Sequence, residues 1–96
     1  MKYMTYAFDC DGTLIDILED KPRPEIVALA HCLVYGKHEV IVWSGGGESY
    51  ARNVAARCGL VGVTVKAKPV GSGIAGIVDV AFDDMNVVYG KLNIKV

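Results

Sequence analysis

Short apolar segments that end at polar residues recur along this chain, and they constrain its fold more than any other feature. Residues 3–8 (YMTYAF), 39–43 (EVIVW) and 61–68, together with a segment inside 77–84, are rich in β-branched and aromatic residues. Each predicts a strand, and the stretch 86–96 supplies a fifth. Near-continuous apolar strands of this kind are typical of a parallel sheet that is covered on both faces.

Two segments between these strands have the pattern of helices. In residues 24–36, apolar residues recur at the i, i+3, i+4, i+7 spacing, with a proline in the first turn and a glycine at the end. Residues 48–59 are rich in alanine and arginine and also end at a glycine. Strands that alternate with helices indicate βαβ crossovers. We therefore predict an α/β fold, a single Rossmann-like three-layer domain over residues 1–96, with a parallel sheet of about five strands and helices on both faces.

Composition narrows the class of protein. A chain of 96 residues with 52% hydrophobic and 22% charged residues is typical of one globular domain. The sequence has no apolar stretch of the roughly 20 residues that cross a bilayer and no signal-peptide pattern, which predicts a cytoplasmic protein. The net charge of -1 argues against a partner held by strong nucleic-acid electrostatics. Three widely spaced cysteines match neither a disulfide framework nor a zinc site.

Polar residues gather where the predicted strands end. In an open parallel sheet, ligands bind outside the carboxyl ends of the strands, so these residues are expected to converge on one site. They are Asp9 and Asp11, Ser44 and Gly45, Lys68, and Asp83 with Asp84.

This set of residues suits phosphoryl transfer through a covalent aspartyl-phosphate. Asp9 would attack phosphorus, and Asp11 would protonate the leaving oxygen and then deprotonate water. Mg²⁺ prefers oxygen ligands, which Asp9, one backbone carbonyl and an aspartate of the pair 83–84 would provide. Ser44 and Lys68 would hold the phosphate oxygens. The two close carboxylates of Asp9 and Asp11 repel each other, which is a reason to expect a cation there.

Four motifs resemble those of the haloacid-dehalogenase-like (HAD) phosphohydrolases. "FDCDGTLID" is similar to the first motif of that family, "VIVWSG" to the second, "KP" at 68–69 to the third and "VAFDD" to the acidic fourth. The resemblance covers essentially the whole chain and implies a Mg²⁺-dependent phosphatase. It implies an Asp9 nucleophile, an Asp11 acid/base whose backbone carbonyl also meets Mg²⁺, and Thr13 in support of the first loop. It further implies phosphate binding by Thr13, Ser44, Gly45 and Lys68. Metal binding is implied for Asp83 and Asp84, with Asp84 favoured as the direct ligand.

The spacing of the motifs leaves no room for the cap domain that many relatives carry. An open site predicts either a large phosphorylated substrate, such as a phosphoprotein or a nucleic-acid end, or a second subunit in a homodimer. A phosphatase that acts on a polynucleotide 3′-phosphate end is one alternative. Arg52 and Arg57 could contact a phosphate backbone, although two arginines on an exposed helix are usually a solvated face. Two alternatives stay open: a regulatory module that binds phosphate and Mg²⁺ without efficient turnover, and a structural protein whose acidic cluster only binds a divalent ion.

Three other features suggest competing interpretations. The run GSGIAG at 71–76 fits the dinucleotide fingerprint, but only a short chain follows it, so a turn that leads into a short helix is the better prediction. Cys10 lies between two aspartates that disfavour its thiolate, so it is not expected to be a nucleophile. Lys66 competes with Lys68, which lies nearer the strand end and precedes a proline.

Overall fold

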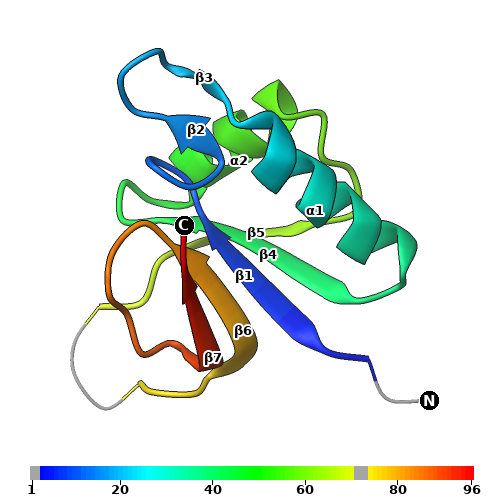
Figure 1. Cartoon of the computed structure of the whole chain (residues 1–96), viewed down its shortest axis with the longest axis vertical. Helices are drawn as coiled ribbons and strands as arrows, with labels where there is room; N and C mark the ends of the chain where they lie inside the picture. Colours follow the sequence, from blue (N-terminus) through cyan, green and yellow to red (C-terminus); the bar gives the residue numbers. More distant parts are fainter. Residues whose placement is uncertain (1–2, 71–73) are drawn as a thin grey trace.

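Five parallel strands form the central sheet in a computed structural model that describes residues 3–70 and 74–96 (Figure 1). Every neighbouring pair of strands in this sheet is parallel. The predicted α/β class and the five strands are confirmed, with ends that differ by a few residues. The strands are β1 (Thr5–Asp9), β4 (Glu39–Ser44), β5 (Thr64–Ala67), β6 (Val78–Asp83) and β7 (Gly90–Lys95).

The order of the strands reverses at β1. From β1 the chain adds β4 and β5 on one side, then returns to add β6 and β7 on the other, which gives the order β5-β4-β1-β6-β7. This is the order of a Rossmann-like sheet, in which ligands bind at the carboxyl ends of the strands beside the reversal point. Here that place lies between the ends of β1 and β6.

Two helices make the first two crossovers, as the sequence predicts. Helix α1 (Pro24–Tyr35) leads from the first strand to β4 and has its proline at the first helical position. Helix α2 (Glu48–Arg57) leads to β5 and ends at Gly59, whose φ of +66° is the left-handed conformation that terminates helices. Among the described residues, neither helix nor any other is long and apolar enough to span a membrane.

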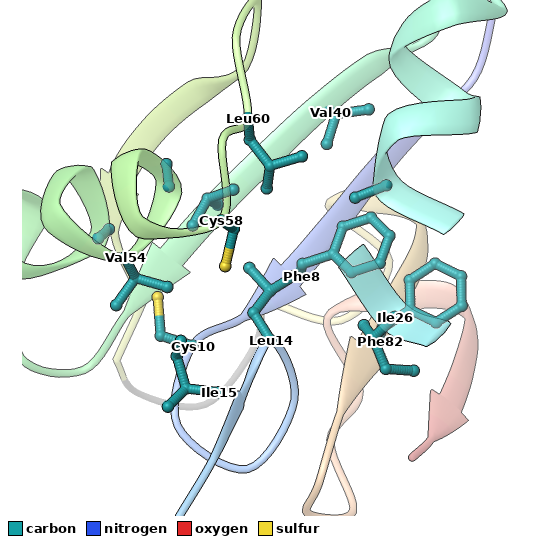
Figure 2. Close-up of a cluster of buried hydrophobic side chains, with 14 of the residues drawn as sticks. Phe8, Cys10, Leu14, Ile15, Ile26, Val40, Val54, Cys58, Leu60 and Phe82 are labelled. Carbon is teal, nitrogen blue, oxygen red and sulfur yellow. The ribbon is translucent and has the colours of Figure 1, made fainter. Parts of the chain in front are cut away.

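Both helices pack on the same face of the sheet (Figure 1). Phe8 and Val40 point to this face, where they belong to the same core cluster as Ile26 of α1 and Val54 of α2, and Figure 2 shows these side chains within that cluster. The expected three-layer arrangement with helices on both faces is therefore wrong for the part of the chain that the structure describes.

The second face carries a smaller apolar cluster with no helix residue in it. Ala7, Ile41 and Trp43 pack there, and Val87 and Tyr89 of the loop between β6 and β7 pack against them. That loop is shorter than the dozen or so residues of a helical crossover, so it covers the face as extended chain.

A two-stranded hairpin after β1 was not predicted. Strands β2 (Ile15–Asp16) and β3 (Lys21–Pro22) pair antiparallel. Two backbone N–H groups of the connecting turn donate to Asp16 Oδ1, and Arg57 of α2 holds the turn through the carbonyl of Asp20 at 2.7 Å. The hairpin thus stands beside the carboxyl end of β1.

The predicted short helix after the glycine-rich run is not seen where the structure can test it. Residues 71–73 of GSGIAG lie outside the described residues. Residues 74–77 form a turn, in which Gly76 has a φ of +70°, and β6 begins directly afterwards. No helix therefore lies between residues 74 and 77.

Candidate functional site

Three carboxylates meet at the point where the strand order reverses. Asp9 ends β1 and Asp83 ends β6, and these strands are neighbours with Phe8 paired to Phe82. Asp84 follows directly. One oxygen from each of Asp9, Asp83 and Asp84 lies within 4.8 Å of the others. The predicted convergence of these residues is therefore present in the fold.

Lys68 is the cation that faces this cluster. Its Nζ lies 3.2 Å from Asp9 Oδ1 and 2.5 Å from Asp83 Oδ2, and its backbone N–H donates to the carbonyl of Ser44 at 2.8 Å. Burial lowers the Lys68 pKa, but the hydrogen bonds and charges of the two aspartates outweigh it and raise the pKa overall. Lys66 is exposed on β5, and the lysine that pairs with Asp9 and Asp83 is Lys68. The geometry thus selects Lys68 over Lys66.

One ammonium group does not neutralise three carboxylates. The remaining repulsion is reflected in the pKa of Asp9. Burial, followed by the charge of Asp83, raises the pKa of Asp9 from 3.8 to about 6, against the opposing effect of Lys68. A second cation with oxygen preference would relieve this repulsion. The donor set therefore fits Mg²⁺, and Asp9, Asp83 and Asp84 are the side chains that would hold it.

Asp83 and Asp84 differ in how their carboxylates are engaged. Asp83 is 1% exposed, and its oxygens accept hydrogen bonds from Lys68 and from the backbone N–H of Met85. Asp84 is half-buried, and within residues 3–70 and 74–96 no hydrogen bond or ion pair engages its carboxylate. This difference favours Asp84 as a direct ligand, in line with the sequence prediction.

Asp11 lies outside the three-carboxylate cluster. Its side chain is exposed, and Asp11 Oδ1 accepts a hydrogen bond of 2.5 Å from the hydroxyl of Tyr50. This bond, followed by burial, raises the pKa of Tyr50 from 10.0 to about 12, so the phenol stays protonated. The sequence interpretation did not single out Tyr50. It missed the residue because a tyrosine in the first turn of a helix carries no motif.

The remaining loop residues occupy different positions at the site. Ser44 is buried at the end of β4, and its hydroxyl accepts from the backbone N–H of Gly46 at 2.9 Å, while Gly45 beside it is exposed. Thr13 is fully buried, and its Oγ1 has no hydrogen-bond partner among the described residues. Thr13 therefore lies beneath the first loop rather than on the surface that would meet phosphate.

The structure bears on two alternative interpretations of the sequence. One is Cys10 as a nucleophile, and the other is Arg52 and Arg57 as nucleic-acid contacts. Cys10 is fully buried, and burial together with Asp9 and Asp11 raises its pKa to about 12, which keeps the thiol protonated. Both candidate nucleic-acid contacts are engaged within the protein: Arg52 pairs with Glu48 at 2.8 Å, and Arg57 holds the hairpin turn at Asp20. Arg57 is therefore engaged at the hairpin, whereas Arg52 makes only an exposed pair within α2 and stays accessible.

No protein-family model, curated protein or solved structure matches this chain. A functional assignment therefore depends on the residues of the site and their geometry.

Proposed function

We propose that this chain is a Mg²⁺-dependent phosphatase of the HAD-like type, without a cap domain, that hydrolyses phosphomonoesters through an aspartyl-phosphate on Asp9. The observation that carries the proposal is the meeting of Asp9, Asp83, Asp84 and Lys68 at the reversal point of the sheet. Three segments that lie far apart in the sequence supply these groups, and a chance capped turn would not assemble them. The resemblance of the four motifs points to the same chemistry.

In the first half-reaction, a carboxylate oxygen of Asp9 attacks phosphorus and the bond to the leaving oxygen breaks. Asp11 gives its proton to that oxygen, which leaves as an alcohol. The Lys68 ammonium, held beside Asp9, stabilises the negative charge on the transferring group. When bound, Mg²⁺ would supply the remaining charge neutralisation and orient the phosphate.

In the second half-reaction, Asp11 takes a proton from water, and the water oxygen attacks phosphorus. The bond between phosphorus and the Asp9 oxygen breaks, which releases inorganic phosphate and restores the carboxylate. We assign phosphate binding to the loop that follows β4, where Gly45 is exposed and Ser44 is buried.

The open character of the site bears on the substrate. Asp11 and Gly45 are both exposed, so the proposed site is accessible from solvent. A phosphorylated substrate large enough to cover the site, or a second subunit, stays a prediction. The engagement of Arg57 at the hairpin and the net charge of -1 make a nucleic-acid end the less favoured substrate.

The test is phosphate release from 4-nitrophenyl phosphate with Mg²⁺, and with EDTA in its place. We expect turnover with the metal only, and we expect Asp9→Asn to abolish it. Glu19→Gln, which removes an exposed carboxylate of the hairpin, serves as the matched control and should leave turnover unchanged. Turnover in Asp9→Asn would overturn the nucleophile assignment. Binding of Mg²⁺ and beryllofluoride without release from any phosphoester would indicate a regulatory module instead.

A further inference from the structure

We infer that Tyr50 is a positioning residue that holds Asp11 in place for proton transfer, an inference that rests on the proposed phosphatase function. The Tyr50 hydroxyl donates to Asp11 Oδ1 at 2.5 Å, across 39 positions of sequence. A hydrogen bond to an ionised acceptor is short and stronger than one between neutral groups. The contact joins the first turn of α2 to the loop that follows β1.

Asp11 depends on this contact for a fixed position. Its side chain is exposed in a turn, and within the described parts of the chain the Tyr50 hydroxyl is the hydrogen-bonding group that engages its carboxylate. An exposed carboxylate without a partner populates several rotamers, and ordering it costs entropy at each turnover. Asp11 is not among the three carboxylates whose oxygens lie within 4.8 Å of one another.

Tyr50 itself is well anchored. Its ring is half-buried and packs against the main core. The ring also lies close to the β4 loop, since a Cβ built on Gly46 would stand 3.5 Å from Tyr50 Cδ2. The tyrosine therefore contacts the loop after β1 through its hydroxyl and lies near the β4 loop, so its hydroxyl has a defined position from which to orient Asp11.

In this arrangement the two carboxylate oxygens of Asp11 have different roles. Tyr50 engages Oδ1, which leaves Oδ2 to carry the proton that the leaving oxygen receives. Once that proton has left, the same hydrogen bond stabilises the carboxylate that then accepts a proton from water. Loss of the hydroxyl should therefore matter most when the leaving group needs a proton.

The experiment compares two esters in the full chain with Mg²⁺. Phenyl phosphate has a poor leaving group that needs protonation, whereas 4-nitrophenyl phosphate has a good one. For Tyr50→Phe we expect kcat/KM for phenyl phosphate to fall about ten- to a hundredfold, and kcat/KM for 4-nitrophenyl phosphate to fall less than about threefold. Tyr35→Phe, which removes a hydroxyl from an exposed ring on α1, is the matched control and should change neither.

A double-mutant cycle tests whether Tyr50 acts through Asp11. In an Asp11→Asn background, Tyr50→Phe should produce no further loss with phenyl phosphate. Equal losses for both esters, additive losses in the cycle, or no loss at all would overturn the inference while the phosphatase assignment stands. If the wild-type chain hydrolyses neither ester, the proposed function fails and this inference fails with it. Coincident thermal unfolding of Tyr50→Phe and wild type excludes misfolding as the cause of a loss.

Discussion

The Asp84 carboxylate occupies the space that a side chain at position 12 would need. A Cβ built on Gly12 would stand 2.1 Å from Asp84 Oδ2 and 2.5 Å from Asp84 Cγ, far inside van der Waals contact. The φ of Gly12 is +83°, a conformation that side chains rarely adopt. The glycine of the first motif thus makes room for a carboxylate of the fourth motif, 72 positions later in the sequence.

Replacement of Gly12 should therefore disturb the proposed metal site as well as the fold. We expect Gly12→Ala to lower the free energy of unfolding by about 2 kcal/mol, from backbone strain and displacement of Asp84. Mg²⁺ affinity, measured by isothermal titration calorimetry, should fall at least about tenfold. Gly59→Ala is the control, since Gly59 has a positive φ but open space around its Cβ position. It should destabilise the protein by about 1 kcal/mol and leave Mg²⁺ affinity unchanged.

The stability of the metal-free protein should depend on the protonation of Asp9. Its pKa in the folded protein, about 6, lies above the value of 3.8 expected on unfolding, so this group favours the folded state below pH 4 and loses that contribution as pH rises through 6. By neutral pH the loss is on the order of 2–3 kcal/mol. In EDTA, Asp9→Asn should therefore be more stable than wild type at pH 7.5 and about equal to it at pH 4.

Urea unfolding of both proteins across this pH range measures the difference. Glu19→Gln, whose carboxylate is exposed, should track the wild type at every pH. A difference between Asp9→Asn and wild type that does not change with pH would contradict the prediction.

Removal of the Lys68 ammonium should leave Asp83 as a buried, unpaired charge. Asp83 is 1% exposed, and loss of one member of such a pair costs about 3 kcal/mol or more. We expect Lys68→Ala to lower the midpoint of thermal unfolding strongly, to recover part of the loss when Mg²⁺ is added, and to abolish phosphate release. Lys66→Ala removes an exposed lysine from the same strand, and a comparable loss in that variant would refute the role assigned to Lys68.

Asp83 and Asp84 should respond differently to neutralisation. Asp84→Asn should weaken Mg²⁺ binding at least about tenfold without loss of stability in EDTA, because no residue in the described part of the chain pairs with the Asp84 carboxylate. Asp83→Asn should lower stability as well, because Lys68 loses the hydrogen-bonded partner at 2.5 Å. Calorimetric titration and urea unfolding of the two variants give the comparison. Equal effects on stability would contradict it.

The strands and helices were predictable because each carries its own local pattern. The apolar runs, the proline at position 24 and the glycine at position 59 placed all seven of the longer elements. The layer arrangement was not predictable in the same way. Whether a crossover carries a helix depends on its length and path, and the loop before Gly90 turned out too short for one.

The charged residues of the site were predictable because they follow the strands directly, and strand ends meet in a parallel sheet. Contacts between side chains that lie far apart in the sequence could not be predicted in this way. Tyr50 and the hairpin held by Arg57 have no local signal: a tyrosine on a helix predicts core packing, and two-residue strands have no periodicity to detect. Only the three-dimensional path of the chain brings Tyr50 to Asp11.

The short segment between the end of β6 and the start of β7 links the proposed site to the edge strand of the sheet. From Asp83 to Gly90 the chain has a reach of about 25 Å, and it must travel back about 17 Å beside β6 to begin β7 in register. The segment is therefore little longer than the path it must cover. The segment carries a carboxylate of the cluster at one end and, at the other, Tyr89, whose ring lies 5.6 Å from Lys68 Nζ. An insertion here would loosen both sides of the site at once, so this stretch should tolerate changes in residue type far better than changes in length.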